Sequence, residues 1–461
     1  MRGTAALVAA SFSIATLSAP AGQVRGSKLK PIEVGTEKQL FIDPLFVERA
    51  RNVKLTMNRP RKTGERCIVA EFPWEGHRVG PYNTVLDEGE VIRMWYDAIA
   101  SDGSRWLCYA ESKDGAHWTK PKLGLVPFGN VKDTNIVFPP QKVPFEPGCV
   151  FIDMNPKCPP DERYKLVCSY RPPGKAARKV GRCEFDDLRD WGKEEVVFSY
   201  DEEDQQGLDK ALFTGMDFYN SSAVKYGNVY LMFPVAYYHY RREAALALGC
   251  PERHAGNDGP MEIHLATSRD GIHWFRPSRE PFIPLGRTCD WDGGIVYSSV
   301  GLVVRGDEVW LYYTAYDFTH GRYDFRRDRF KGVITRAVLR LDGFVSVDAG
   351  HEGGEFVTPP LVFGGRRLVL NVKTTAGGHV RVELQDADGR PISGFTAEGC
   401  DPINGDYIRK VVTWRGREDL SALRGRPVRL RFVMRDAKLF SFQFAERPSK
   451  AGGLQPPSHG A

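Results

Sequence analysis

Hydrophobic and aromatic residues recur along this chain in short runs that alternate with turn-forming residues. This spacing predicts strands rather than helices. Four such runs, at residues 93–96, 164–167, 230–233 and 309–313, each follow an earlier apolar run and a turn-rich stretch. The order predicts a repeated unit of inner strand, hairpin and middle strand, present four times between about residues 75 and 350.

A seven-residue pattern, Ser-Lys/Arg-Asp-Gly-x-His-Trp, occurs twice, at residues 112–118 and 268–274. The Asp-Gly step predicts a tight turn in which glycine takes a positive φ angle, and we expect the tryptophan to pack between neighbouring units. With two weaker copies, four aspartates follow one another at steps of 73, 83 and 72 residues: Asp114, Asp187, Asp270 and Asp342. This period suits four-stranded propeller blades, and we interpret Asp114 and Asp270 as turn residues without a chemical role.

Two changes of composition divide the rest of the chain. Residues 36–60 contain further apolar runs, which we expect to supply a fifth blade that closes the ring. Beyond Gly350 the pattern becomes one of short alternating strands, and from residue 447 it is rich in proline and glycine. The predicted fold class is therefore all-β: a five-bladed β-propeller over residues 36–350, followed by a small C-terminal β-sandwich over residues 351–446. We expect residues 447–461 to be a disordered tail.

The N-terminal residues have the order of a secretion signal. Arg2 supplies a basic start, residues 5–17 are largely apolar, and Ala19-Pro20-Ala21 offers small residues at a cleavage site. The apolar run is too short for a stable membrane span, and no other stretch approaches that length. We predict a signal peptide over residues 1–21 and a secreted or periplasmic protein.

Charge and cysteine content narrow the classes of partner. The formal net charge of +6 is small for 461 residues and is spread along the chain, so no nucleic-acid partner is expected. The nine cysteines show no close CxxC pair, which leaves their pairing open and supports neither a zinc knuckle nor a thioredoxin motif. We predict no cofactor, no metal site and no membrane span, while a structural cation at the propeller centre stays compatible with the sequence. The oligomeric state is open.

Several segments carry a family resemblance. They are residues 39–43, 73–76, 93–96 and 339–344, together with both turn motifs. The chain resembles the five-bladed propeller glycoside hydrolases, most of all bacterial proteins with a family 32-like N-terminal domain and more distantly family 43. Residues 399–402 and 428–432 are similar to the sandwich appended to such proteins. The resemblance implies a carbohydrate substrate and acidic residues around a central funnel. The Trp-Met-Asn-Asp-Pro, Arg-Asp-Pro and Glu-Cys motifs of family 32 are absent, so no catalytic residue is carried over.

Strand order selects the catalytic candidates. Because inner strands of a propeller converge on its axis, carboxylates directly before them should point into one funnel. Glu75, Asp217 and Asp292 hold this position in three different units, and we expect two of them to be the acid and the base or nucleophile. Acids crowded in a funnel raise one another's pKa. The alternative for each is a salt bridge or a turn cap.

Aromatic, basic and further acidic residues beside these carboxylates are candidates for substrate binding. Flat aromatic rings suit the apolar faces of sugars, although such rings also fill the space between blades. The two histidines and Arg322 lie in the long insertions at residues 236–262 and 317–332, which we expect to shape the pocket; the alternative is a solvated basic loop. The candidates are Trp74, Arg78, Glu146, Tyr219, Asn220, His239, Asp290, Trp291, His320 and Arg322.

These features favour an exported glycoside hydrolase that acts on a poly- or oligosaccharide through a pair of carboxylates in the funnel. A non-catalytic carbohydrate-binding propeller is the first alternative. A polysaccharide lyase, with histidine or tyrosine as base and arginine beside a uronate, is the second. No Gly-x-Ser-x-Gly elbow supports serine catalysis. The sugar, the linkage and the stereochemical outcome are left open.

Overall fold

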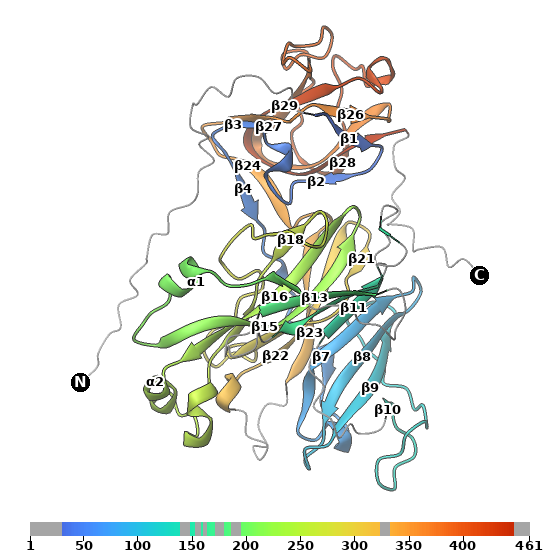
Figure 1. Ribbon diagram of the computed structural model, residues 1–461. Helices are drawn as coiled ribbons and strands as arrows, with labels where there is room; N and C mark the ends of the chain where they lie inside the picture. Colours follow the sequence, from blue (N-terminus) through green and yellow to red (C-terminus); the bar gives the residue numbers. More distant parts are fainter. Residues whose placement is uncertain are drawn as a thin grey trace. The chain divides into compact units, whose positions relative to one another are not determined.

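The computed structural model describes residues 30–138, 148–152, 158–159, 164–170, 179–185, 195–322 and 332–446. Strands dominate this part of the chain (Figure 1), so the all-β prediction is confirmed. The described residues form two compact units: a larger unit of residues 38–43 and 57–346, and a smaller unit of residues 30–37, 44–56 and 347–446. The expected signal peptide (1–21) and tail (447–461) lie outside the described residues.

Antiparallel sheets of sequence-adjacent strands build the larger unit. The first sheet contains β7 (Arg78–Asp87), β8 (Ile92–Ile99), β9 (Arg105–Ser112) and β10 (Ile136–Phe138). The second contains β11 (Gly148–Ile152), β12 (Tyr164–Tyr170), β13 (Lys179–Phe185) and β14 (Glu195–Phe198). Alternation defines β8, in which Ile92, Met94 and Tyr96 are buried and the residues between them are partly exposed.

The third and fourth sheets are joined into one. The third has β15 (Phe213–Tyr226), β16 (Val229–Tyr240), β18 (Ala266–Ser268) and β19 (Trp274–Phe275), and the fourth has β20 (Ile295–Ser298), β21 (Val303–Arg305), β22 (Glu308–Tyr316) and β23 (Val333–Arg340). The short strand β17 (Met261–Ile263) pairs with both β16 and β20 and links them. Strands β5 (Arg61–Lys62) and β6 (Ile68–Val69) add to the outer edge of the fourth sheet by pairing with β23.

Two hydrophobic cores hold neighbouring sheets together. Residues of β8 pack with Tyr312 and Ile334 of the fourth sheet, while Val167 and Val180 of the second sheet pack with Phe218 of the third. Inner strand β7 also runs parallel to the end of β20, where the Val85 N–H donates to the Val300 carbonyl at 2.8 Å. The last sheet therefore meets the first, and sheets are arranged around adjoining inner strands as in a propeller.

Both copies of the turn motif fold in the same way. Asp114 accepts two backbone N–H groups that follow Gly115, at 2.9 and 2.8 Å, and Asp270 accepts the two equivalent groups at 2.8 Å. These hydrogen bonds hold the pKa of Asp114 well below its usual range. Gly115 and Gly271 have φ angles of 74° and 75°, which confirms the predicted turn.

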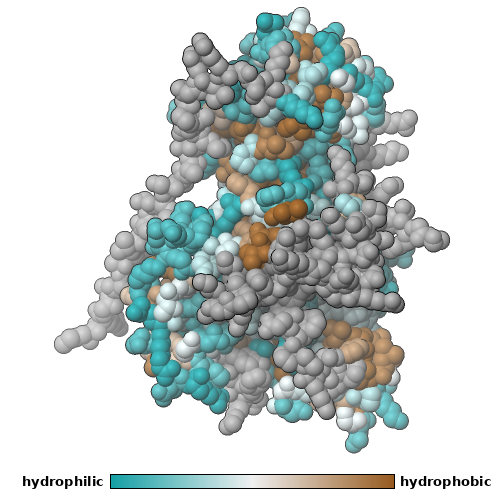
Figure 2. Space-filling model, viewed as in Figure 1, coloured by the Kyte–Doolittle hydropathy of each residue, from teal (hydrophilic) through white to brown (hydrophobic). Residues whose placement is uncertain are grey.

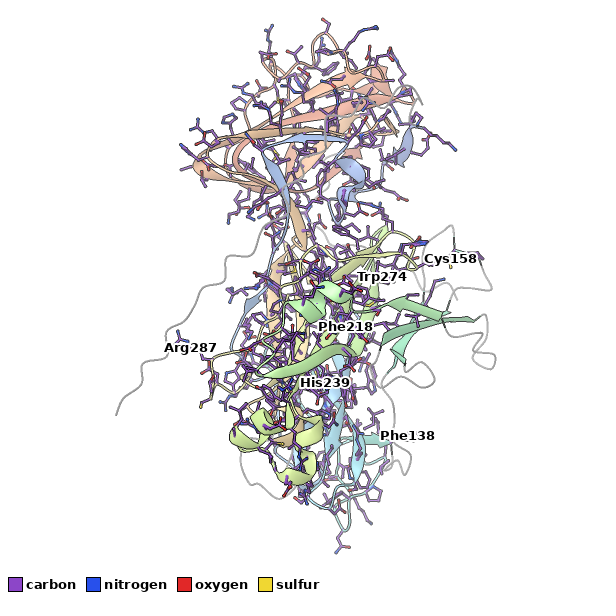
Figure 3. The ribbon with its side chains drawn as sticks, turned by 60° about the vertical axis from the view of Figure 1, so that its left-hand side comes forward. Phe138, Cys158, Phe218, His239, Trp274 and Arg287 are labelled. Carbon is purple, nitrogen blue, oxygen red and sulfur yellow. The ribbon has the colours of Figure 1, made fainter. Side chains whose placement is uncertain are left out.

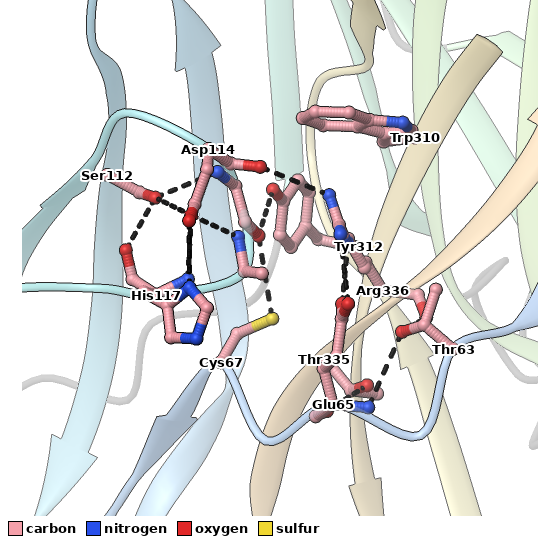
Figure 4. Close-up of polar contacts among 12 residues, drawn as sticks. Thr63, Glu65, Cys67, Ser112, Asp114, His117, Trp310, Tyr312, Thr335 and Arg336 are labelled. Atoms are coloured by element: carbon pink, nitrogen blue, oxygen red, sulfur yellow. Dashed lines mark hydrogen bonds and ion pairs between the residues drawn. The ribbon is translucent and has the colours of Figure 1, made fainter.

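The first copy of the motif also fastens two sheets together (Figure 4). Tyr312 of β22 donates a hydrogen bond to the Gly115 carbonyl at 2.8 Å, and Trp118 meets the Tyr312 ring edge to face at 5.6 Å. A Cβ atom at Gly115 would lie 2.6 Å from atoms of Trp310 and Tyr312. Close approach between the sheets therefore requires glycine here.

Short helices occupy the connections of the larger unit. They are η2 (Pro73–Glu75), α1 (Glu202–Gln206), α2 (Arg242–Ala247), η4 (Glu252–Asn257) and η5 (His320–Arg322). Of the helices in the described ranges, none is long and apolar enough to cross a membrane. Free thiols are found at Cys67, Cys108, Cys158, Cys250, Cys289 and Cys400. On the surface, Leu107 and its partner Phe138 are exposed on the first sheet, where Figure 2 shows a hydrophobic area.

The smaller unit is a β-sheet structure centred on two long strands, β27 (Arg367–Asp386) and β29 (Val428–Ala445), which pair along most of their length. Its other elements are β1 (Ile32–Gly35), η1 (Pro44–Phe46), β3 (Arg49–Arg51), β4 (Val53–Met57), β24 (Val345–Ala349), β25 (Gly354–Val357), β26 (Leu361–Phe363), β28 (Asp406–Val411) and η6 (Ser421–Leu423). Stacked phenylalanines line its core, such as Phe363 and Phe444, whose ring centroids are 3.9 Å apart.

Residues 36–60 do not form the expected fifth blade. Residues 44–56 belong to the smaller unit, where β3 pairs with β25, and residues 38–43, with β2 (Gln39–Leu40), belong to the larger unit. The physical reason is that strand β25 offers β3 an edge some 300 positions later in the sequence, where each strand satisfies the backbone hydrogen bonds of the other.

Candidate functional site

Tyrosines from three sheets meet where the inner strands adjoin. Tyr82 of β7 and Tyr219 of β15 both contact Tyr297 of β20, with ring centroids 6.1 and 5.9 Å apart. Tyr237 of β16 contacts Tyr219 at 5.7 Å, and Tyr316 of β22 contacts Tyr297 at 6.3 Å. We call these five residues the tyrosine cluster. Burial raises the pKa of Tyr82 and Tyr297 well above the usual range, so both phenols stay neutral.

Asp97 and Arg105 form an ion pair at the edge of the tyrosine cluster. Asp97 lies near the end of β8 and Arg105 begins β9, so the hairpin between these strands brings them together. The Arg105 guanidinium lies 5.9 Å from the centroid of the Tyr82 ring. A Cβ atom at Gly80 would lie 2.4 Å from a carboxylate oxygen of Asp97, so glycine allows this side chain to rest against the inner strand.

The surroundings of Asp97 act on its charge in opposite directions. Burial raises its pKa, while the positive charges of Arg105 and Arg78 lower it, and the net effect is a raised pKa. Arg78 begins inner strand β7, and its guanidinium carbon lies 5.6 Å from the centroid of the Tyr316 ring. The same charge lowers the pKa of Tyr82 and Tyr297, against the larger effect of burial.

A second carboxylate, Asp217, lies beside the cluster on β15. It is buried, and one of its oxygens is 3.4 Å from Nε2 of His239 on the neighbouring strand. The His239 ring packs on Tyr237 with centroids 4.0 Å apart. A register shift between Phe218 and Asn220 follows Asp217, and the Asn220 side chain is also buried. Figure 3 shows His239 toward the α2 end of the third sheet and Trp274 toward its other end, so the turn motif lies away from this site.

The insertions position His320 over the cluster. Its Nδ1 lies 3.0 Å from the Asn257 carbonyl, which only accepts hydrogen bonds, so we assign the proton to Nδ1. Nε2 then accepts from the Tyr219 hydroxyl at 3.3 Å. Asp258, which directly follows η4, accepts a hydrogen bond from the Gly321 N–H of η5 at 2.7 Å. Its carboxylate also lies 3.7 Å from Nε of Arg322, so the Arg322 guanidinium faces Asp258.

Glu75 and Trp74 lie elsewhere, in the core of the first sheet. Glu75 has no exposed surface, and it accepts hydrogen bonds from the Tyr96 hydroxyl at 2.6 Å and from two backbone N–H groups, with Lys120 at 2.9 Å. Trp74 donates to Asn135 at 2.9 Å and is 2% exposed. Both are occupied as structural residues, which argues against the expected catalytic and binding roles.

Asp292 is bound to a lysine rather than to the cluster. Its carboxylate lies 2.6 Å from Nζ of Lys62 on β5. Burial is the main cause of the raised pKa of Tyr313, and the negative charge of Asp292 raises this pKa further. Asp290 is exposed and accepts a backbone N–H of its own turn at 2.9 Å, the turn-cap alternative. Trp291 is half-buried. Glu146 lies outside the described residues.

The structure thus brings together Asp217, Tyr219, His239, His320 and Arg78 of the expected residues. Sequence reasoning missed Asp97, Arg105 and Tyr237, because only acids before inner strands were considered. A signal was present: the alternation along β8 buries Met94 and Tyr96 on one face and places Asp97 on the other, beside the hairpin. Within the described ranges, there is no group of three or more His, Cys, Asp or Glu residues that could hold a metal ion.

Comparison with known proteins gives no match to any family model or curated protein. Among solved structures, one described as a glycoside hydrolase is 13% identical, with 61% of this protein and 92% of that protein covered and a TM-score of 0.38. The catalytic domain of the Coprinopsis cinerea GH62 α-L-arabinofuranosidase is 10% identical, with coverage of 62% and 97% and a TM-score of 0.36. An N-acetylgalactosamine deacetylase from F. plautii, in complex with blood group B trisaccharide, is 14% identical, with coverage of 67% and 96% and a TM-score of 0.32. At these TM-scores the likeness does not decide the activity of this protein.

Proposed function

We propose that the protein is a glycoside hydrolase and that the tyrosine cluster is its sugar-binding site. The observation that carries this proposal is the presence of two carboxylates with different surroundings, Asp97 and Asp217, beside the same group of tyrosines. Asp217 keeps its expected role. Asp97 takes the place of Glu75, which is enclosed in the core of the first sheet, and of Asp292, which is bound to Lys62 rather than to the cluster.

The two carboxylates suit the two roles that glycoside hydrolysis requires. Asp97 has a raised pKa, so it is the better proton donor to the oxygen of the leaving sugar when the bond from that oxygen to the anomeric carbon breaks. Asp217 is buried beside the His239 imidazole, with one carboxylate oxygen 3.4 Å from Nε2. It activates the attacking water or attacks the anomeric carbon itself.

The tyrosines and His320 give the site a means of holding sugar. Flat tyrosine faces suit the apolar faces of sugar rings, and phenol groups supply hydrogen bonds to hydroxyls. The Tyr219 hydroxyl donates a hydrogen bond to Nε2 of His320 at 3.3 Å, which orients this phenol within the cluster. The signal-like order of residues 1–21 supports a location outside the cytoplasm, and recovery of a periplasmic or secreted form that begins after Ala21 would test this.

Amide substitutions test the assignment, because they keep the shape of the side chain and remove its titration. Asp97→Asn and Asp217→Asn should each lower turnover by roughly 10²- to 10⁴-fold in protein that still folds, and Asp97→Asn should also lose some stability because Arg105 loses its partner. The matched control is Asp292→Asn, another buried acid just before an inner strand. It should retain turnover and lose stability, because Lys62 loses its partner.

A panel of poly- and oligosaccharides, read for reducing ends and for unsaturated products, supplies the assay. Full turnover by both Asp97→Asn and Asp217→Asn would remove this site from consideration. Binding of glycan without cleavage by the wild type would support the carbohydrate-binding alternative. Unsaturated products would instead indicate a lyase, with Tyr219 and His320 as the proton-transferring pair.

A further inference from the structure

The segment that ends η4 holds η5 through three hydrogen bonds. The Asn257 carbonyl lies 3.0 Å from Nδ1 of His320, and the Gly259 carbonyl accepts the backbone N–H of His320, also at 3.0 Å. Between these two residues, the Asp258 side chain accepts the Gly321 N–H at 2.7 Å. Three consecutive residues of one insertion therefore hold two consecutive residues of the other.

Asp258 is the side chain at the centre of this attachment. It has no exposed surface, and the oxygen that binds the Gly321 N–H also accepts the Gly259 N–H at 2.8 Å. Its other oxygen lies 3.7 Å from Nε of Arg322. A buried carboxylate is stable only when hydrogen bonds and opposite charge compensate for the loss of water. The compensating groups come from both insertions, so this carboxylate stabilises the contact between them.

Packing at Gly321 is equally close. A Cβ atom there would lie 2.6 Å from Cβ of Asp258, and 2.9 Å from both Sγ of Cys250 and the His254 carbonyl oxygen. Gly321 does not have a positive φ angle, so glycine is required here by the close approach and not by the backbone conformation. A side chain at this position would push η5 away from η4.

His320 is the residue of η5 that reaches the tyrosine cluster. Its ring lies against those of Tyr219 and Tyr237, with centroids 5.3 and 5.1 Å apart, and its Nε2 accepts from the Tyr219 hydroxyl. The hydrogen bond at Nδ1 decides which ring nitrogen carries the proton. If η5 moved away from η4, Nδ1 would lose the Asn257 carbonyl. A proton on Nε2 would then prevent this nitrogen from accepting the Tyr219 hydroxyl.

We propose that Asp258 is a positioning residue of the tyrosine cluster: it holds η5 against η4, and thereby keeps the proton of neutral His320 on Nδ1 and the Tyr219 hydroxyl in one direction. The inference rests on the proposed function, because it takes the tyrosine cluster as the place where sugar binds. Asp258 acts through His320 and takes no part in bond cleavage. The His320 and Tyr219 pair is arranged before the sugar arrives, so binding does not have to order it.

Two substitutions with different physical effects release η5. Asp258→Ala removes the acceptor of the Gly321 N–H, whereas Gly321→Ala keeps that acceptor and forces the two segments apart. Asp258→Asn keeps an oxygen for both N–H groups and should restore most of the wild-type behaviour. Two matched controls leave η5 in place. Asp270→Ala removes another acceptor of two backbone N–H groups, and Gly256→Ala puts a Cβ in η4 with no atom within 4 Å.

The first measurement is the tautomer of His320 in the free protein. NMR of the histidine ring nitrogens distinguishes protonated from unprotonated atoms, and the His320 signals are those that disappear in His320→Gln. Above the usual histidine pKa, the wild type and both controls should carry the proton on Nδ1. Asp258→Ala and Gly321→Ala should show a mixture of both tautomers, while Asp258→Asn should show the wild-type form.

The second measurement is the separation of KM from kcat. The probes are para-nitrophenyl glycosides of common pentoses and hexoses, and the kinetics use the glycoside that the wild type cleaves fastest. Asp258→Ala and Gly321→Ala should raise KM by roughly three- to tenfold, as expected when a hydrogen bond to the sugar is lost. Because Asp97 and Asp217 are intact, kcat should change little.

A His320 tautomer that stays on Nδ1 in both Asp258→Ala and Gly321→Ala overturns the inference. A change of tautomer that leaves KM at the wild-type value also overturns it, as does an equal rise of KM in Asp270→Ala and Gly256→Ala. Gly321→Ala decides the outcome if Asp258→Ala does not fold. A wild type that cleaves none of the glycosides counts against the proposed function alone, since the tautomer still shows whether Asp258 positions His320.

Discussion

Glu75, Asp97, Asp217 and Asp292 are all largely hidden from solvent, and what separates them is the partner of each carboxylate. Lys120 and Lys62 come from 45 and 230 positions away to bind Glu75 and Asp292. Arg105 comes from eight positions away to bind Asp97 at the cluster. Local pattern identifies a carboxylate at a strand entrance, but a partner from a distant strand decides whether it is a structural ion pair.

The same reasoning explains which site residues the sequence could predict. Tyr219 and Arg78 were predictable because each is close in sequence to a carboxylate at the entrance of an inner strand. His239 and His320 were predictable as polar residues of insertions in a fold whose loops shape pockets. Asp97 was not predictable from the sequence, because its role depends on its close approach to β7, which only the glycine at position 80 permits.

Arg105→Gln should alter the pH dependence of turnover. Burial raises the pKa of Asp97 and Arg105 opposes that rise, so removal of the arginine raises the pKa further. Asp97 then keeps its proton to higher pH, and the alkaline limb of the kcat profile should move to higher pH.

The control for this prediction is Arg93→Gln, an arginine of the same sheet that pairs with Glu88. It should leave the limb in place. An alkaline limb that stays fixed or moves to lower pH in Arg105→Gln would show that Asp97 is not the proton donor.

At the scale of elements, the two copies of the turn motif have one local geometry and two environments. Their hydrogen bonds and φ angles agree, as the repeated sequence predicted. Gly115 is in close contact with Trp310 and Tyr312 of another sheet, whereas the nearest atoms to a Cβ at Gly271 belong to Tyr230 and lie 3.6 Å away. A motif specifies its own turn, but residues of other elements specify what the turn packs against.

Gly115→Ala should be more destabilising than Gly64→Ala. Both glycines have positive φ, 74° and 79°, so both substitutions carry about 1–2 kcal/mol of backbone strain. A Cβ at Gly64 has no atom within 4 Å, while one at Gly115 would lie 2.6 Å from Trp310 and Tyr312. Overpacking should add about 1–3 kcal/mol to the loss in Gly115→Ala.

Urea unfolding monitored by circular dichroism measures this difference. Equal losses of stability in the two variants would contradict the view that the motif fastens the first sheet to the fourth.

For the whole molecule, the expected boundary near Gly350 is close to the observed division after Ser346. The contribution of residues 30–37 and 44–56 to the smaller unit was not predictable in the same way. Their apolar runs fit a strand of either unit, and the choice depends on a pairing between positions about 300 residues apart, such as Arg51 with Glu355. Hydrophobic pattern gives the face that a strand buries, but it gives no information about a distant partner.

Residues 347–446 should not fold stably by themselves. Strands β25 and β26 would lose their partners β3 and β1 and expose open edges. Trp414 is the only tryptophan in this segment and is buried in the complete unit, so its fluorescence reports folding. We expect a red-shifted emission for the segment alone and a return to the blue on addition of a peptide of residues 30–56.

A peptide of the same composition in scrambled order is the control and should have no effect. A segment of residues 347–446 that melts cooperatively at the temperature of the intact unit would show that the N-terminal strands are dispensable.

The discontinuity of the smaller unit also determines the timing of events during synthesis. Residues 30–56 leave the ribosome before the rest of the smaller unit, and about 290 residues follow before Val347 is made. At ~5–20 residues per second, this interval lasts roughly 15–60 s. Throughout it, β1 and β3 lack the strands that complete their hydrogen bonds, and they are open to mispairing with other chains. The nascent protein therefore needs protection longest at the end that was made first.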